Sequence, residues 1–307
     1  MCNFAVEMKI LLAVFTSVFA WVGCFSQPIA APSPQEKIKV LSWNIYMLPS
    51  IIKATGKQQR AEAIGRLLRD SDYDVIVFQE AFQQRARRKI FEQLKDRFPY
   101  QAGPANQQLI SYRTNSGLWI FSKHPIVSTQ SIVFRNRSGV DAFSRKGGLI
   151  AEISVEGTPI QVAATHLQNS GQPWVRQSQC VEFYNRLLKP FYREGVPQII
   201  CGDFNIARQS DEYDFMLQTL HAENGDLIGD EQFSYDRANN DVTAEPGNRR
   251  ELIDYVLLKC NSMNSVAMVR KIRKLQSNWH AHHKDLSDHY ALEAEVQFLP
   301  PLLVSRK

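Results

Sequence analysis

Short apolar runs rich in β-branched residues alternate with segments of helical periodicity along this chain, and this alternation limits its fold more than any other feature. Residues 74–80 (DVIVFQE) are typical of a fully buried strand, and residues 58–70 repeat apolar positions at helical spacing. Further strands are expected at 37–44, 108–113, 117–123, 126–134, 147–155, 159–168, 196–201, 251–259, 265–272 and 288–298, and further helices at 83–98, 173–191 and 210–220. Two halves of similar character predict an α/β protein with two sheets packed face to face and helices outside.

Residues 37–298 show no break in composition, so we expect one domain there, preceded by a Pro-rich linker at 27–36 and followed by a tail at 299–307. Apolar residues make up 44% of the chain and charged residues 22%, as in a globular protein with a full core. The net charge of +5 suits an anionic partner such as phosphate, nucleic acid or an acidic membrane surface. An evenly mixed basic surface is the simpler explanation.

The first 26 residues are expected to be a secretory signal peptide. Lys9 precedes an uncharged segment at 10–23, which is shorter than the about 20 apolar residues that a membrane span needs. A start at Met8 instead of Met1 would suit such a peptide better. Cys24 ends a weak lipoprotein cleavage box, so lipid anchoring is a less favoured alternative to secretion.

Three cysteines, Cys180, Cys201 and Cys260, lie beyond the targeting segment. Their wide spacing forms no CxxC or Cys/His pattern, so a structural zinc site is not expected. Cys201 and Cys260 end apolar runs and are expected to be buried, although one disulfide among the three remains open in a secreted protein.

Polar side chains stand where the apolar strands end. Gly202, Asp203 and Asn205 follow the strand at 196–201, and a turn is the simplest explanation of this stretch alone. The same arrangement recurs at other strand ends, which carry Asn44, Glu80, His166, Asp254, Asp288 and His289. If these side chains converge, the resulting pocket of acids, amides and imidazoles is costly without a cation. Hard oxygen ligands suit Mg²⁺, Mn²⁺ or Ca²⁺.

Six ordered blocks resemble the endonuclease/exonuclease/phosphatase superfamily: SWN (42–44), QE (79–80), TH (165–166), GDFN (202–205), IDYVLL (253–258) and SDH (287–289). The resemblance covers nearly the whole mature chain. It implies a four-layer α/β sandwich of two packed mixed sheets flanked by helices, with the active site at one end of the sheets.

Longer segments are similar to secreted bacterial neutral sphingomyelinases: WNIYMLP (43–49), THLQ (165–168) and SDHYALEAEV (287–296). The segment DAFSRKG (141–147) matches the D-x-x-x-x-K-G block of neutral sphingomyelinases and adds Asp141 and Lys146 to the expected catalytic residues. An exposed ion pair in a loop is the alternative explanation of these two residues.

The resemblance implies a metal-dependent phosphodiesterase that hydrolyses sphingomyelin to ceramide and phosphocholine with an activated water. Glu80, helped by Asn44, would hold the metal, and Asp288 would hold a metal or orient a neighbour. The implied metal is Mg²⁺, with Mn²⁺ or Co²⁺ as substitutes. The implied partner is a sphingomyelin-containing membrane surface, with no obligate protein partner evident.

The resemblance also implies a role for each remaining site residue. His289 would be the general base, and Asp254 would orient its ring. Asp203 and Asn205 would position the water and the phosphate. His166 would donate to the phosphoryl oxygens or the leaving group, and Lys146 would add positive charge.

A quaternary ammonium headgroup favours aromatic faces. Tyr46 and Phe143 adjoin motif residues and are preferred over Trp119, Trp174 and Trp279. Residues 278–283 (NWHAHH) are expected to be a solvated loop, with a membrane-facing or metal-binding loop as alternatives. No long apolar hairpin is evident between 260 and 287, which leaves membrane docking open.

Two other functions remain to be compared. A secreted DNase or other phosphoesterase of the same superfamily is favoured by the shared GDFN and SDH blocks and the positive charge, and nucleic acid would be the partner only in that case. A binding protein that has lost the chemistry is disfavoured because every expected catalytic residue is present.

Overall fold

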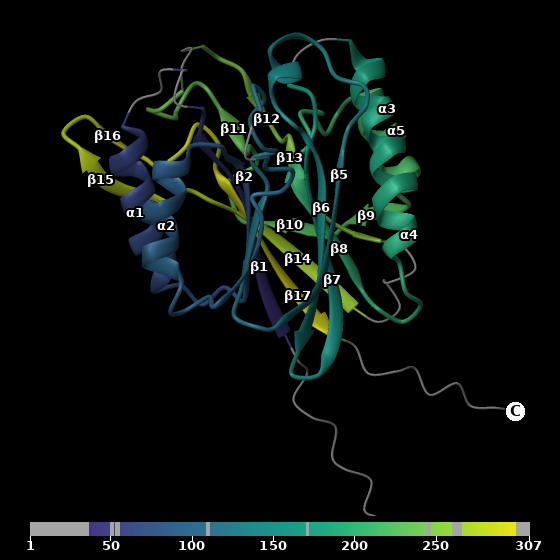
Figure 1. The fold of residues 1–307 in the computed structure, drawn as a ribbon. Helices are drawn as coiled ribbons and strands as arrows, with labels where there is room; N and C mark the ends of the chain where they lie inside the picture. Colours follow the sequence, from purple (N-terminus) through teal and green to yellow (C-terminus); the bar gives the residue numbers. More distant parts are fainter. Residues whose placement is uncertain are drawn as a thin grey trace, which may run out of the picture. The chain divides into compact units, whose positions relative to one another are not determined.

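A seven-stranded sheet and a six-stranded sheet stack on each other, and helices cover the outer side of each (Figure 1). The computed structural model describes residues 37–49, 52, 56–108, 111–169, 172–243, 247–259 and 266–298, which all belong to one compact unit. This is the expected four-layer α/β sandwich. The predicted signal peptide, linker and tail lie outside the described residues.

The first sheet has the order β10–β14–β17–β1–β2–β4–β3. Its strands are β1 (Lys37–Met47), β2 (Val75–Ala81), β3 (Tyr100–Ala102), β4 (Trp119–Ser122), β10 (Asp226–Ile228), β14 (Val266–Arg273) and β17 (Ala291–Phe298). Strand β1 runs parallel to β2 and antiparallel to β17. Helices α1 (Lys57–Arg69) and α2 (Gln84–Leu94) share a core with this sheet.

Side-chain alternation along β1 decides where its polar end points. Ile38 and Val40 belong to the core that includes the second sheet, whereas Leu41 and Trp43 pack in the core with α1 and α2. Successive side chains of a strand point to opposite faces, so Asn44 continues the face of Ile38 and Val40. The strand therefore directs Asn44 toward the second sheet.

The second sheet has the order β5–β6–β7–β8–β13–β9. Its strands are β5 (Ile126–Val133), β6 (Gly147–Val155), β7 (Thr158–His166), β8 (Gln198–Asp203), β9 (Ala222–Asn224) and β13 (Asp254–Lys259). Helices α3 (Pro173–Phe183), α4 (Lys189–Phe191) and α5 (Asp211–Leu220) accompany it. Gly202 is required in β8 because a Cβ there would lie 2.3 Å from the backbone oxygen of Thr165 in β7.

The segment expected to be a solvated loop at 278–283 is instead part of a two-stranded hairpin, β15 (Gln276–His280) and β16 (His283–Asp285). Contacts of the Trp279 side chain hold this segment in the hairpin. Its Nε1 donates a hydrogen bond to the Asp285 carbonyl at 2.7 Å, and its ring stacks on His283. A second short antiparallel pair is formed by β11 (Tyr235–Asp236) and β12 (Arg250–Glu251).

One sequence prediction of regular structure is wrong, and one predicted helix is confirmed with an irregular turn inside it. Residues 108 and 111–113 form no strand, because the Ser111 hydroxyl accepts a hydrogen bond from the Arg113 amide and stabilises a local turn. The helix expected at 173–191 is α-helical to Phe183, continues as a π-helical turn over Tyr184–Leu188, and ends with α4.

Cys180 and Cys201 are buried free thiols, and Cys260 lies outside the described residues. No helix among the described residues is long and apolar enough to cross a membrane.

Candidate active site

Strand register in the second sheet brings three polar residues side by side. His166 ends β7 and is the register partner of Asp203, which ends the parallel strand β8. Asp254 begins β13, which runs antiparallel to β8, and it is also a partner of Asp203. Apolar strands thus fix all three side chains, which are at least 98% buried, at one edge of the sheet.

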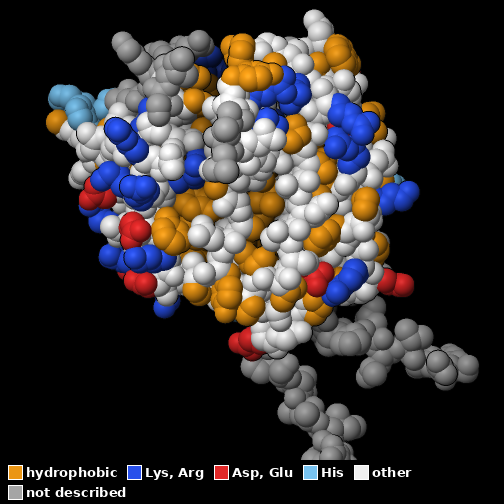
Figure 2. Space-filling view, in the orientation of Figure 1, with side chains coloured by type: hydrophobic (Ala, Val, Ile, Leu, Met, Phe, Trp, Pro, Cys, Tyr) orange, Lys and Arg blue, Asp and Glu red, His pale blue; other side chains and the backbone are white. Residues whose placement is uncertain are grey.

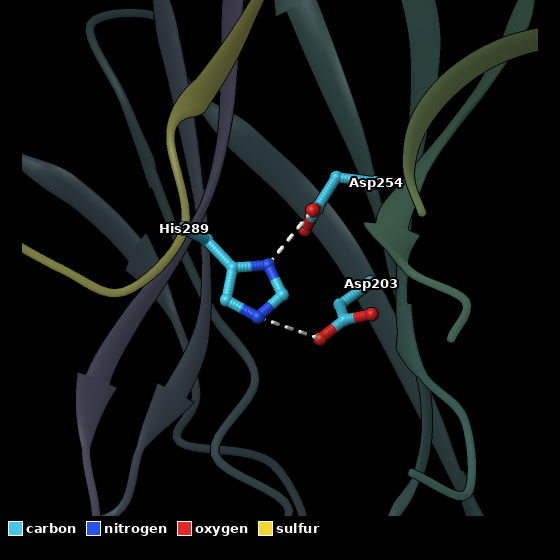
Figure 3. A group of neighbouring side chains, drawn as sticks. All are labelled: Asp203, Asp254 and His289. Carbon is cyan, nitrogen blue, oxygen red and sulfur yellow. Dashed lines mark hydrogen bonds and ion pairs between the residues drawn. The ribbon is translucent and has the colours of Figure 1, made fainter. Parts of the chain in front are cut away.

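His289 meets this edge from the first sheet, where it precedes β17. Its Nδ1 lies 2.8 Å from Asp254 Oδ2, and its Nε2 lies 3.8 Å from Asp203 Oδ2 (Figure 3). The Trp43 indole donates to the His289 carbonyl at 2.9 Å and holds the backbone in place. Because a carboxylate only accepts, Nδ1 carries a proton and Nε2 is the nitrogen left for chemistry.

Asn44 and Glu80 complete the contribution of the first sheet. Asn44 Nδ2 donates to Asp203 Oδ2 at 2.9 Å, and its Oδ1 accepts from the Tyr46 amide. Glu80 lines a cavity that Asp203 and His289 also line. Side-chain alternation along β2 from Ile76 and Phe78 would instead direct Glu80 toward the helices. A left-handed backbone at Glu80, with φ of 56°, interrupts that alternation.

Left-handed backbone recurs at this site. Tyr46 has φ of 51° and Asn205 has φ of 53°, and both line the cavity with Glu80. A non-glycine residue in this region carries strain of about 1 kcal/mol or more, which the surrounding fold must offset. Strained backbone therefore coincides with the ends of three strands where polar side chains turn into the cavity.

Burial disfavours the charged forms of the carboxylates. Burial and the nearby Asp288 raise the pKa of Glu80 to about 8. Burial and Asp254 raise the pKa of Asp203 to about 6, and burial also raises the pKa of Asp288. Glu80 Oε2 is buried and has no hydrogen-bond partner among the described residues. A dication beside these oxygens would satisfy both the charge and the orphaned oxygen.

The chain therefore has the donor set of a divalent metal site. Asp203, Asp254 and His289 each offer a ligand atom, and these atoms lie within 4.8 Å of one another. Asp254 and His289 Nδ1 are already engaged with each other, so we favour the oxygens of Glu80, Asp288 and Asn44 as ligands.

The two imidazoles differ in their protonation. Burial alone would lower the pKa of His289, but the carboxylates of Asp254 and Asp203 raise it well above 6.5. Burial and the neighbouring Lys146 ammonium lower the pKa of His166 well below 6.5.

Lys146 joins Asp141 and His166 into one cluster. Its Nζ lies 3.1 Å from Asp141 Oδ2, 3.1 Å from His166 Nε2 and 2.9 Å from the Leu167 carbonyl. An ammonium only donates, so His166 Nε2 accepts from Lys146 in this geometry. His166 Nε2 therefore does not donate to a phosphate in this geometry. The positively charged Lys146 suits that expected donor role better. The Asp141–Lys146 pair is largely buried, not an exposed loop pair.

One cavity of about 780 Å³ is lined by Glu80, Asp141, Lys146, His166, Asp203, Asp288 and His289. Asn205 lines it beside Asp203 and donates its side-chain amide to the Leu167 carbonyl at 3.2 Å. Both aromatic candidates for the headgroup, Tyr46 and Phe143, line it as well. Of the other aromatic residues considered, Trp119 is buried in the core with α1 and α2, and neither Trp174 nor Trp279 lines the cavity.

Three supporting residues were not predicted from the sequence. The buried Arg60 guanidinium donates to the carbonyls of Ile45, Tyr46 and Leu286 and ties β1 to the loop that carries His289. The sequence feature that could have identified Arg60 is its charge on the apolar face of the helix at 58–70. Ser287 donates to the Asn44 carbonyl at 2.6 Å, and the Tyr235 ring lies 5.0 Å from that of His289. Ser287 opens the SDH block but was given no role, and nothing in the sequence pattern marks Tyr235.

Known proteins share this architecture. The chain is 29% identical over 259 residues to Sphingomyelinase C 2 of Leptospira interrogans. That alignment covers 75% of this chain and 41% of the relative. The chain thus spans about two-fifths of that relative's length. It is 26% identical over 310 residues to Sphingomyelinase C of Bacillus cereus, covering 89% of this chain and 93% of the relative.

A solved structure of a Staphylococcus aureus beta toxin variant with bound magnesium ions has a TM-score of 0.78 and 24% identity, covering 84% of this chain and 99% of that one. The family described as "Endonuclease/Exonuclease/phosphatase family" matches residues 41–289, which include the strand ends that meet at the cavity. With its two stacked sheets and this match along most of its length, the chain belongs to the endonuclease/exonuclease/phosphatase family.

Proposed function

We propose that this chain is a Mg²⁺-dependent sphingomyelin phosphodiesterase that releases ceramide and phosphocholine at a sphingomyelin-containing membrane. The observation that carries the proposal is the contact between His289 and Asp254, which leaves His289 Nε2 beside Asp203 in the cavity. Relatives named Sphingomyelinase C, one aligned over 93% of its length, support the substrate class.

The chain's own groups can carry out the hydrolysis of a phosphodiester. Neutral His289 accepts a proton at Nε2 from a water molecule, whose oxygen forms a bond to phosphorus as the bond between phosphorus and the ceramide oxygen breaks. Asp254 holds the ring through Nδ1 and stabilises the imidazolium that forms, as a triad carboxylate does. The released ceramide oxygen takes up a proton from solvent water, and the His289 imidazolium then returns its proton to solvent. Asp203, oriented by Asn44, helps to place the water.

Glu80 and Asp288, with Asn44, would hold the Mg²⁺. When bound, the ion supplies stabilisation for negative charge on the phosphate and favours the neutral form of the nearby imidazole. Lys146, fixed by Asp141, adds a second positive charge to the cavity wall. Tyr46 and Phe143 offer ring faces to a quaternary ammonium at the cavity mouth.

The purified chain should release phosphocholine from sphingomyelin in detergent micelles, and a chelator should abolish the release. Restoration by Mg²⁺, and less fully by Mn²⁺ or Co²⁺, would support the metal assignment. Parallel assays with phosphatidylcholine and plasmid DNA test the substrate class. Nicking of DNA with inert sphingomyelin would replace this proposal with the nuclease alternative.

We also propose secretion, supported by the uncharged segment at 10–23 after Lys9. Expression of the full sequence in a bacterial host should place activity in the medium or periplasm. Retention of the full-length chain in the cytoplasm would contradict the proposal. Incorporation of labelled fatty acid that is lost in Cys24→Ser would favour the lipoprotein alternative.

A further inference from the structure

The three most exposed large apolar side chains among the described residues all line the mouth of the active-site cavity. They are Tyr112, Val140 and Phe143, which are 82%, 76% and 66% exposed. Tyr112 belongs to the segment before β4, and the other two belong to the 3₁₀ helix Gly139–Phe143 between β5 and β6. Apolar groups from two separate segments therefore share one rim, which is unusual for a surface in contact with water alone.

Three arginines adjoin this rim. Arg113 follows Tyr112, and its guanidinium carbon lies 5.2 Å from the centre of that ring. Arg137 precedes the 3₁₀ helix and Arg145 follows it. Burial and the charges of Arg113 and Arg145 lower the pKa of Arg137, so the three guanidinium groups lie near enough to repel one another.

These arginines lack acidic partners that would neutralise them. None of the three forms an ion pair with a carboxylate within the described parts of the chain, although Glu182 attracts Arg137 at longer range. Among the described residues, the side-chain hydrogen bonds of the Arg145 guanidinium go to the neutral side chains of Gln108 and Ser111. The cluster thus carries positive charge that no ion pair neutralises within the described structure, and this charge complements a layer of lipid phosphates.

We propose that Tyr112, Val140, Arg113, Arg137 and Arg145 form a docking surface for an anionic membrane, which selects bilayers by lipids that are not the substrate. This inference rests on the proposed function for its biological meaning. Apolar side chains enter the interface between headgroups and acyl chains, while arginines contact lipid phosphates around them. Apolar and basic side chains adjoin at the upper edge of Figure 2, the end where β5 and β6 are joined in Figure 1.

A membrane fits this surface better than a nucleic acid does. Nucleic acid would use the arginines but would gain little from Val140, an aliphatic side chain that is 76% exposed. Tyr112, Val140 and Phe143 line the same cavity as Glu80 and His289, so docking there would bring lipid headgroups to the cavity that holds those two residues.

Binding to vesicles without sphingomyelin tests the surface separately from hydrolysis. The purified chain, with chelator present, is floated with vesicles of phosphatidylcholine alone or with one-third phosphatidylglycerol. We expect binding to the anionic vesicles only, weakened by salt. Each arginine near such a surface contributes about fivefold, so Arg113→Gln/Arg137→Gln should weaken binding about 25-fold. The control pair Arg85→Gln/Arg88→Gln removes the same charge from exposed positions on α2 and should change binding less than twofold.

A second variant tests the apolar part. Tyr112→Ser/Val140→Ser should weaken binding to anionic vesicles at least fivefold at high salt, where charge is screened. All variants must keep the thermal unfolding midpoint of the parent chain and its phosphocholine release from detergent micelles. Equal binding to both vesicle types, equal loss in the control pair, or arginine-dependent binding to a DNA fragment without vesicle binding would overturn the docking surface. Absence of phosphocholine release in micelles would overturn the proposed function and leave the docking result standing.

Discussion

His289 of the first sheet and Asp254 of the second meet across the stacked sheets, with 2.8 Å between Nδ1 and Oδ2. Each residue is 6% exposed or less, so the contact lies in an environment with little water. The contact is both the orienting bond of the proposed base and a tie between the sheets. Changes to either residue therefore test how the site is assembled.

Asp254→Asn and His289→Ala should lose activity non-additively. His289→Ala removes the base and should lower the rate about 10²–10⁴-fold. Asp254→Asn should lower it by a similar factor, because an amide can hold the wrong tautomer of His289. The double variant should be little slower than His289→Ala alone when phosphocholine release is measured. Multiplied losses would show that Asp254 acts on its own, and Asp72→Asn at the surface provides the control.

Glu80→Gln should weaken metal binding more than it weakens the catalytic step. A neutral amide is a poorer ligand for a hard dication, so the Mg²⁺ concentration that gives half-maximal activity should rise at least tenfold. Excess Mg²⁺ should restore part of the rate in this variant and none in His289→Ala. Calorimetric titration with Mg²⁺ provides a readout without substrate. Unchanged affinity for Mg²⁺ would remove Glu80 from the ligand set.

Stabilisation by Mg²⁺ should increase with pH. Burial and Asp288 raise the pKa of Glu80 from 4.5 to about 8 in the metal-free folded chain. The folded chain then binds more protons than the unfolded chain between those values, so the metal-free chain loses stability as pH rises through that window. A dication offsets the charge that appears. The rise in unfolding temperature on adding Mg²⁺ should thus be larger at pH 8 than at pH 6, and Glu80→Gln should reduce the difference.

Phe143→Leu should reduce the preference for a quaternary ammonium. The ring face is lost while an apolar side chain of similar size remains. The ratio of kcat/KM for sphingomyelin to that for ceramide phosphoethanolamine should fall several-fold. Trp174→Leu, which removes an exposed aromatic ring away from the cavity, should leave that ratio unchanged. Equal effects of both variants would argue for a general surface contribution.

Arg60→Met should destabilise the fold by about 3 kcal/mol, because the carbonyls of Ile45, Tyr46 and Leu286 lose a charged donor. Urea unfolding measures the loss. Arg66→Met, on the same helix but exposed and paired with Glu62, should cost about 0.5 kcal/mol or less. A matching loss in the two variants would show that Arg60 is not a structural tie.

The sequence predicted the layers and most strand-end residues because both follow from local rules. Apolar periodicity located β2 and α1 closely. Parallel and antiparallel partners align at one sheet edge, so His166, Asp203 and Asp254 could be expected together. A charge within the apolar stripe of α1 could have identified Arg60.

Other features depend on contacts that no local pattern encodes. The hairpin β15–β16 is polar by composition, and Trp279 orders it through a contact with the Asp285 carbonyl. The segment at 108–113 has strand-like residues in its sequence, yet the Ser111 hydroxyl accepts a hydrogen bond from the Arg113 amide, which favours a turn. The acceptor role of His166 depends on Lys146, which is 20 residues away in the chain.

The active site is divided between two sheets, so catalysis also depends on core residues that do not contact the substrate. Val77 of the first sheet and Ala164 of the second belong to the apolar layer between them, and the volume of that layer sets the separation of the sheets. A single added or removed methyl group there can shift Asp254 relative to His289 while the fold persists. Selection for catalytic turnover therefore acts on core side chains as well as on the active site. It restricts their size more narrowly than folding alone requires.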